Sequence, residues 1–196
     1  MASPKSIPNA AFKNALIIGL GAFFLAIGLS FISQGLLSRI KSVLPAVLLL
    51  LFIILLGILF DIIGTAVTKA AEHPFHAKAA TKTYGAKEAV WLTKNADKVA
   101  SFCNDVVGDI SGTLSGAIGV ALVVRVTING TDVVEILFNT LMTASIAAVT
   151  IGGKAYGKSY ALKEAEHIIF KVGKTIALLQ GIWTFSYFSG NQKRGK

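Results

Sequence analysis

The chain has 196 residues, of which 54% are hydrophobic and only 15% are charged, and its formal net charge at pH 7 is +9. Globular domains carry about 25% charged residues, so the composition excludes an ordinary soluble domain and is typical of a membrane protein. The positive charge forms no basic cluster with interleaved aromatic residues, which argues against nucleic acid as a partner. A single cysteine, Cys103, excludes internal disulfides and thiolate metal clusters, and we expect it to be a small buried residue.

Four segments are apolar over a length that suits a membrane span, although the third has only 15 uncharged residues, between Asp109 and Arg125. The first is too long for a signal peptide, so we expect it to be retained. The second contains 19 consecutive uncharged residues from Ser42 to Phe60, enough to cross roughly 30 Å of hydrocarbon at about 1.5 Å per residue. The third carries glycine and serine at every fourth position, which allows close helix packing in lipid. The expected spans cover residues 15–37, 44–68, 106–126 and 133–152.

The segment from Lys69 to Asn104 is different, because it carries six lysines against three acidic residues. We expect two short amphipathic helices on the cytoplasmic membrane surface, one near 67–83 that bends at Pro74 and one near 86–94. Gly85 is expected to break the chain between them. Aromatic residues in this hairpin are expected to anchor it at the membrane interface. They are Phe75, Tyr84 and Trp91.

Asparagines and an amphipathic pattern predict a helix cap, a turn and a further helix in the rest of the chain. Asn95 is expected to cap a further helical turn, and the dipeptide Asn129-Gly130 predicts a tight turn between the last two spans. After Lys154 we expect a new helix over 160–180, whose apolar stripe faces the membrane interface. A basic aromatic tail over 183–196 follows.

The distribution of lysines predicts the orientation. The lysine-rich hairpin and the C-terminus are expected on the cytoplasmic side, and an even number of spans puts the N-terminus there too. Arg39 and Lys41 then lie outside, against the rule. If residues 15–37 lie in the membrane interface instead, the other three spans keep their orientation.

Oxygen-bearing side chains near the spans predict a cation site. Asp61, Thr65 and Thr68 follow one another at i, i+4 and i+7, so one helix face carries all three. A carboxylate this close to a span is costly unless it is paired, hydrated or bound to an ion, and hard divalent cations prefer oxygen ligands. The alternative is that the aspartates pair with lysines at the headgroups, and an Asp61 bonded only to an ammonium would argue against transport. The candidate metal ligands are Asp61, Thr65, Asp109, Ser111 and Ser115.

Other chemistry has weak support in the sequence. His73 and His76 beside Glu72 lack a third strong ligand, so we interpret them as interfacial residues rather than a metal site. We find no phosphate-binding loop, nucleotide-binding pattern or nucleophile context. We therefore expect no enzyme activity, and no cofactor other than Mg²⁺ or Co²⁺ as a transported ion.

The order of these parts resembles the transmembrane domain of the cyclin-M/CorC family of magnesium and cobalt transporters, most closely its CorB-like members, over about residues 45–176. That family ends its first core span in Ser-Gly-x-Glu-Thr-Ala. Here Thr65-Ala66 match, Asp61 stands at the serine position and Gly64 replaces the glutamate. The last core span of the family ends in Gly-Glu-x-x-Pro-Lys. The corresponding residues here are Gly153, Lys154, Gly157 and Lys158, of which the first and last match.

The resemblance implies a divalent-cation transport domain over 44–182, preceded by an extra span within 1–43. It also implies a bacterial plasma-membrane protein and a homodimer formed through the small-residue faces. Two carboxylates of the family pattern are absent, and Lys154 occupies one of their positions. This difference favours a second hypothesis, a non-transporting membrane adaptor or structural protein that retains the fold. A third is a module that binds the lipid surface through its Lys/Arg-rich faces.

Overall fold

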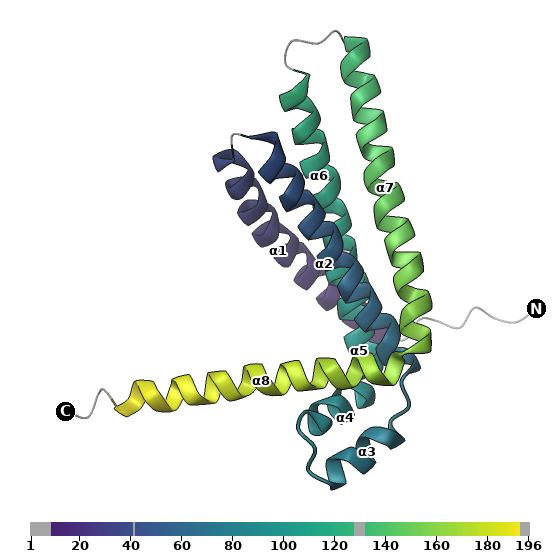
Figure 1. Ribbon diagram of the computed structural model, residues 1–196, viewed down its shortest axis with the longest axis vertical. Helices are drawn as coiled ribbons and strands as arrows, with labels where there is room; N and C mark the ends of the chain where they lie inside the picture. The colour runs from purple at the N-terminus through teal and green to yellow at the C-terminus, as the bar shows by residue number, and fades with distance from the viewer. Residues whose placement is uncertain (1–8, 41, 128–131, 193–196) are drawn as a thin grey trace, which may run out of the picture. The chain divides into compact units, whose positions relative to one another are not determined.

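The computed structural model describes residues 9–40, 42–127 and 132–192, and all regular structure in these ranges is helical. Four helical runs are candidate membrane spans by length and composition. They confirm the predicted all-helical class with four long apolar helices (Figure 1). The runs are α1 (Asn9–Arg39), α2 (Val43–Lys69), Ala96–Val126 and α7 (Asp132–Lys163).

The third run is composite, because a π-helix interrupts it. The remaining helices are short, apart from α8, which follows α7 after a single residue. The elements are α3 (His73–Ala80), α4 (Ala86–Lys94), α5 (Ala96–Ser101), the π-helix η1 (Phe102–Gly108), α6 (Asp109–Val126) and α8 (Ala165–Gln192).

The chain forms two compact units, and the long helices α2, α6 and α7 each contribute to both. The first unit comprises Met1–Ile53 and Gly112–Ile146, and the second comprises Ile54–Ser111 and Ala147–Lys196.

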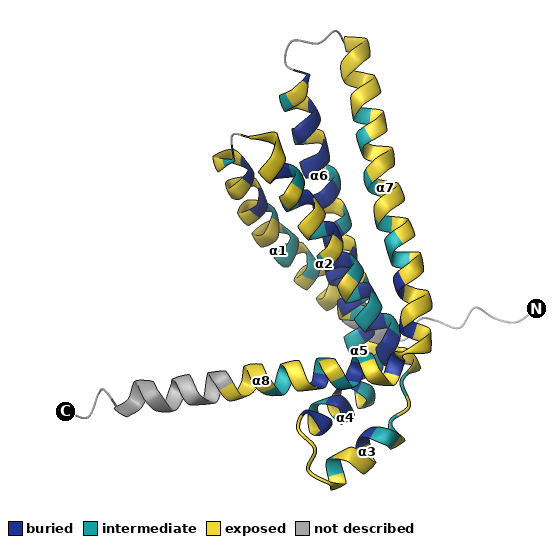
Figure 2. Ribbon diagram, viewed as in Figure 1, coloured by how far each residue is buried: buried dark blue, intermediate teal, exposed yellow. Residues whose placement is uncertain are grey.

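Apolar side chains dominate the surface of the first unit. Large hydrophobic residues such as Phe24, Leu48 and Leu137 are exposed along α1, α2 and α7, and Figure 2 shows these stretches as mainly exposed. Exposed apolar surface on this scale is unfavourable in water and suits contact with hydrocarbon. The first unit therefore has the surface expected of a membrane-embedded part.

A fork of hydrogen bonds from Arg125 joins two helix ends in the first unit. Its guanidinium donates to the carbonyl oxygen of Ile40 at 2.7 Å and to that of Leu37 at 2.6 Å. The last carbonyls of a helix have no partner within the helix, and the planar guanidinium can satisfy two at once. Arg125 thus holds the end of α6 against the end of α1.

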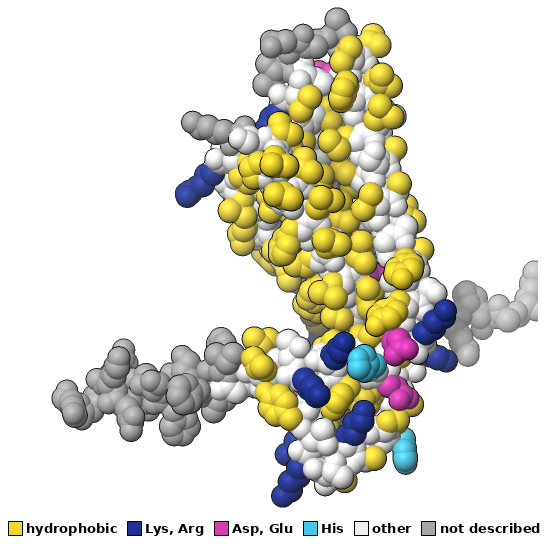
Figure 3. Space-filling model, viewed as in Figure 1, with side chains coloured by type: hydrophobic (Ala, Val, Ile, Leu, Met, Phe, Trp, Pro, Cys, Tyr) yellow, Lys and Arg dark blue, Asp and Glu magenta, His cyan; other side chains and the backbone are white. Residues whose placement is uncertain are grey.

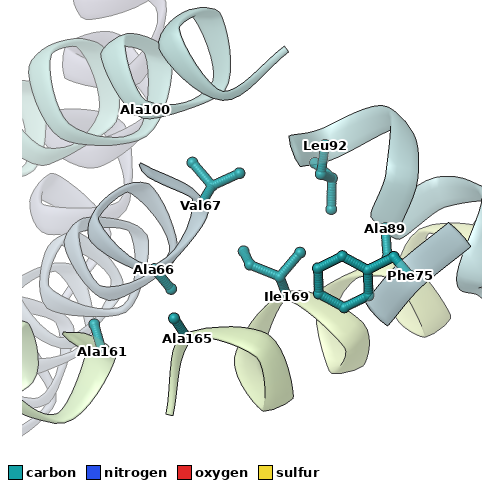
Figure 4. Packing of buried hydrophobic residues seen from close by; sticks show 9 residues of the cluster. All are labelled: Ala66, Val67, Phe75, Ala89, Leu92, Ala100, Ala161, Ala165 and Ile169. Atoms are coloured by element: carbon teal, nitrogen blue, oxygen red, sulfur yellow. The ribbon is translucent and has the colours of Figure 1, made fainter. Parts of the chain in front are cut away.

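The second unit has a hydrophobic core built by helices from distant parts of the chain. Phe75 of α3 is fully buried and lies beside Ile169 of α8 and Ala89 of α4 (Figure 4). Small residues elsewhere in the core let the helices approach closely. The full cluster is Ala66, Val67, Phe75, Ala89, Leu92, Ala100, Ala161, Ala165 and Ile169.

Two glycines set the contact between α4 and α8. Gly85 precedes α4 with φ at +80°, a conformation that side chains rarely adopt. A Cβ at Gly85 would lie 2.6 Å from the backbone of Lys174, and a Cβ at Gly173 would lie 2.9 Å from the amide nitrogen of Ala89. The predicted chain break at Gly85 is confirmed, and its cause includes this close packing.

Several predicted details of the hairpin are wrong. Pro74 does not bend a helix, because α2 ends at Lys69 and Pro74 occupies the first turn of α3, where its missing N–H costs nothing. Phe75 is a core residue and no interface anchor, whereas Tyr84 and Trp91 are exposed, and their role as anchors stays a prediction.

The predicted boundary between the last two helices is also wrong. α7 continues through Gly152 and Gly157 to Lys163, and α8 then extends to Gln192. A glycine costs a helix about 1 kcal/mol, and the packing of Gly153 and Gly157 on Ile58 and Ile62 outweighs that cost. The predicted Asn129-Gly130 turn and the basic residues at 193–196 lie outside the described residues.

Candidate ion site at Asp61

Asp61 is a buried carboxylate in the second unit, near the end of α2. It is only 3% exposed. The ammonium group of Lys154 lies 3.8 Å from its Oδ1, and that of Lys158 lies 3.6 Å from its Oδ2. Both lysines belong to α7 and are four residues apart, so one helix face presents both to the carboxylate.

These ion pairs are looser than hydrogen bonds. Both distances exceed the 2.7–2.9 Å usual for an ammonium that donates to a carboxylate, and Oδ2 of Asp61 accepts no hydrogen bond within the described ranges. The side chain of Lys154 is 21% exposed and that of Lys158 is 52% exposed. One negative and two positive charges therefore meet at a site that is closed on the side of Asp61 and open on the side of Lys158.

Glycines of α2 bring the π-helix and the start of α6 close to Asp61. Gly57 lies one turn before Asp61, and a Cβ there would lie 2.8 Å from the Cβ of Ser111. Gly64 lies nearly one turn after Asp61, and a Cβ there would collide with the side-chain amide of Asn104. The small residues on this face of α2 thus let a second helix pass beside the carboxylate.

Glycines of α7 perform the same role on the lysine side. A Cβ at Gly157 would lie 2.7 Å from the side chain of Ile62, and a Cβ at Gly153 would collide with Ile58. The ammonium group of Lys154 reaches to 3.4 Å from where a Cβ of Gly108 would lie. Close packing of α7 on α2 is therefore what places the lysines beside Asp61.

The π-helix η1 supplies a further polar atom. Asn104 lies in η1, and its side-chain Oδ1 is buried without a hydrogen-bond partner among the described residues. Single π-helical turns inside α-helices are frequent at functional sites. A buried amide oxygen that accepts no hydrogen bond is costly, so Asn104 is a candidate ligand outside the five residues predicted from the sequence.

The other predicted ligands have varied surroundings. Thr65 is half-buried, and its carbonyl oxygen accepts a hydrogen bond from Oγ1 of Thr68. Asp109 is exposed, whereas Ser111 two residues later is buried, so the two lie on different faces of α6. Oγ of Ser111 donates to the carbonyl oxygen of Val107 at 2.7 Å. Ser115 is fully buried and belongs to the first unit.

The sequence allows the aspartates to pair with lysines, but it does not specify Lys154 and Lys158 as the partners of Asp61. The pattern that could identify these two lysines is their i, i+4 spacing beside Gly153 and Gly157. No sequence pattern specified which face of α7 meets α2.

A dedicated metal centre has no support from the described residues. Among them no three His, Cys, Asp or Glu side chains are grouped so as to hold a metal ion. His76 Nε2 instead lies 2.6 Å from Glu72 Oε1, and Lys94 lies 3.9 Å from the same oxygen. Cys103 is buried, as expected.

Comparison of the chain with models of protein families, with curated proteins and with solved structures finds no match.

Proposed function

We propose that this is an integral membrane protein, similar in plan to the cyclin-M/CorC transmembrane domain, in which the chain's own lysines take the place of a transported cation at Asp61. The observation that carries the proposal is the approach of Lys154 and Lys158 to within 4 Å of one buried carboxylate. On this proposal the protein is a non-transporting membrane adaptor or structural protein.

Electrostatics supports this choice. Two unit charges 4 Å apart interact by roughly 4 kcal/mol at an effective dielectric constant of about 20. A divalent cation at Asp61 would face repulsion of that order, multiplied by its double charge, from each ammonium group. Mg²⁺ or Co²⁺ can therefore bind the carboxylate only after both lysines have moved away.

A second candidate function is transport of Mg²⁺ or Co²⁺ with the lysines as displaceable counter-ions. Three observations favour it: the ion pairs exceed hydrogen-bond length, Lys158 is half exposed, and the buried Oδ1 of Asn104 has no hydrogen-bond partner among the described residues. Both lysines belong to α7, so one shift of that helix would withdraw them together. Asp61 and Asn104 would then offer oxygens of the type that hard cations prefer.

Flux into proteoliposomes that contain a magnesium-sensitive dye separates the two functions. The proposal predicts that the wild-type protein conducts no more Mg²⁺ or Co²⁺ than protein-free liposomes do, and that Asp61→Asn changes nothing. Wild-type flux that is abolished by Asp61→Asn would overturn it in favour of transport.

Thermal unfolding in detergent adds a readout that does not depend on flux. We expect Mg²⁺, Co²⁺ and Na⁺ to leave the wild-type melting temperature unchanged. The variant Lys154→Gln/Lys158→Gln frees Asp61, so Mg²⁺ at a hundredfold excess over Kd should raise its melting temperature by about 5–10 °C. The variant Lys87→Gln/Lys98→Gln removes the same charge from exposed positions and should show no such gain.

The four candidate spans also support a placement in the membrane. With the lysine-rich α3–α4 hairpin in the cytoplasm, the positive-inside rule places both termini there as well. The resemblance suggests the plasma membrane of a bacterium and a homodimer, and both stay predictions.

A further inference from the structure

A second cluster of positive charge lies away from Asp61, around a cavity in the second unit. The cavity has a volume of about 390 Å³, within the range of small-ligand sites. Its lining comes from the last residues of α2 and α7, from α3 and from the first turns of α8. The charged residues among them are Lys69, Lys78, Lys163, Glu164, Glu166 and His167.

The lysines of this cavity lack acidic partners. In the part of the chain that the structure describes, no carboxylate lies within 4 Å of the ammonium groups of Lys69, Lys78 or Lys163. The ammonium group of Lys78 instead lies 4.2 Å from the ring centroid of Phe170, and that of Lys174 lies 4.5 Å from the same centroid. These two ammonium groups repel each other, and only that of Lys78 lines the cavity, so an anion in the cavity would offset part of the positive charge at Lys78.

The position of the cavity along the helices identifies the source of the anion. Lys69 is the last residue of one candidate span, and Lys163 is the last residue of another. Lysines that end a membrane span lie at the level of the lipid headgroups. Figure 3 shows lysine and histidine side chains, with acidic side chains among them, over α3 and the start of α8.

We infer that this cavity binds the phosphate of an anionic phospholipid headgroup, with Lys69, Lys78 and Lys163 as the cationic contacts. The inference depends on the four candidate spans crossing a membrane, and it is independent of any ion at Asp61. Glu164 and Glu166 line the same cavity, so the phosphate is expected on the side of the lysines, away from the two carboxylates. A headgroup with a single phosphate and an otherwise uncharged polar part meets this condition.

The test uses the full-length protein in a mild detergent. Its melting temperature is followed during titration with phosphatidylglycerol or phosphatidylcholine, and native mass spectrometry counts the lipids retained. We expect phosphatidylglycerol to bind more tightly and to stabilise the wild-type protein. In Lys78→Gln/Lys163→Gln its apparent affinity should fall by roughly fivefold for each lysine removed, the effect of about 1 kcal/mol per basic residue near a membrane surface.

The controls distinguish specific binding in the cavity from nonspecific attraction of the lipid to surface lysines. Lys87→Gln/Lys98→Gln removes the same charge outside the cavity and should keep wild-type affinity, and Lys78→Arg should keep most of the binding because it retains the charge. Equal loss in both double variants would overturn the inference, as would equal stabilisation by phosphatidylcholine. Competition by inorganic phosphate at the concentration of the lipid would assign the site to a soluble anion and would also overturn it.

Discussion

Gly64 shows how one missing side chain shapes the surroundings of Asp61. Because a Cβ at this position would collide with the amide of Asn104, Gly64→Ala should push η1 away from α2. We expect the variant to lose about 1–3 kcal/mol of stability, the usual cost of overpacking. Its melting temperature in detergent measures the loss.

The matched control is Gly112→Ala in α6, in the helical run that also contains Asn104, since no atom lies within 4 Å of a Cβ there. That change should be neutral or stabilising, because alanine favours a helix over glycine by about 1 kcal/mol. Equal behaviour of the two variants would contradict the close packing of Gly64 on Asn104.

Arg125 is the second residue whose role can be measured directly. Its two charge-assisted hydrogen bonds to Ile40 and Leu37 need a planar fork, so Arg125→Lys should keep the charge and lose one of the bonds. We expect a destabilisation of about 1.5–3 kcal/mol, measured as a fall in melting temperature. Arg39→Lys, at an exposed position, should change little.

At the residue scale the sequence indicated that Asp61 is unusual, but it did not indicate which residues pair with it. Asp61 attracted attention because a carboxylate beside nineteen uncharged residues is costly. Lys154 and Lys158 lie more than ninety residues from Asp61 along the chain, and only the packing of Gly153 and Gly157 on α2 brings them near. Periodicity indicates the face of a helix, and it does not indicate which other helix covers that face.

At the element scale Phe75 links α3 to α4 and α8. Its ring is fully buried in the core of the second unit, so Phe75→Ala should cost about 3–5 kcal/mol. The loss should be local, since α3 and α4 are short helices that depend on this packing. Hydrogen exchange should show faster exchange of the amides of α3 and α4.

Tyr84→Ala provides the comparison for that experiment. Tyr84 lies in the same hairpin and is 56% exposed, so its removal should leave the exchange of α3 and α4 unchanged. If Phe75→Ala gave the same protection as the wild type, α8 would have to hold the hairpin by other contacts.

The sequence predicted which segments are helical better than it predicted where they end. Gly85 broke the chain as expected, because its positive φ and its contact with Lys174 both require glycine. Gly153 and Gly157 did not break α7, since their packing on Ile58 and Ile62 outweighs the helix propensity of glycine. The π-helix at 102–108 has no signature in composition, because its residues are ordinary helix residues.

At the scale of the whole molecule the chain should cross the membrane four times with both termini inside. The Arg125 fork supports this path, because it joins the end of α1 to the end of α6, and alternate spans of such a path end on the same side. In a Cys103→Ser background, Arg39→Cys should react with a membrane-impermeant thiol reagent on intact cells. Lys82→Cys, exposed between α3 and α4, should react only after permeabilisation.

Labelling of Lys82→Cys on intact cells would show that the orientation is the reverse of the predicted one. Labelling of neither site would mean that Arg39 does not reach the outer surface, as expected if residues 15–37 lie along the interface.

The wide turn at Phe102–Gly108 fixes the phase between α5 and α6. A π-helix closes its hydrogen bonds over five residues rather than four, so it stores one surplus residue within an otherwise α-helical run. Deleting one residue there would return the run to a regular α-helix with nearly the same phase, because the wide turn takes up the extra residue. Deleting one residue from the regular helix α6 would instead rotate all that precedes it by about 100°, so that Ala100 would leave the core and Asn104 would leave Gly64. The number of residues in α6, as much as their chemistry, is therefore a constraint on the chain.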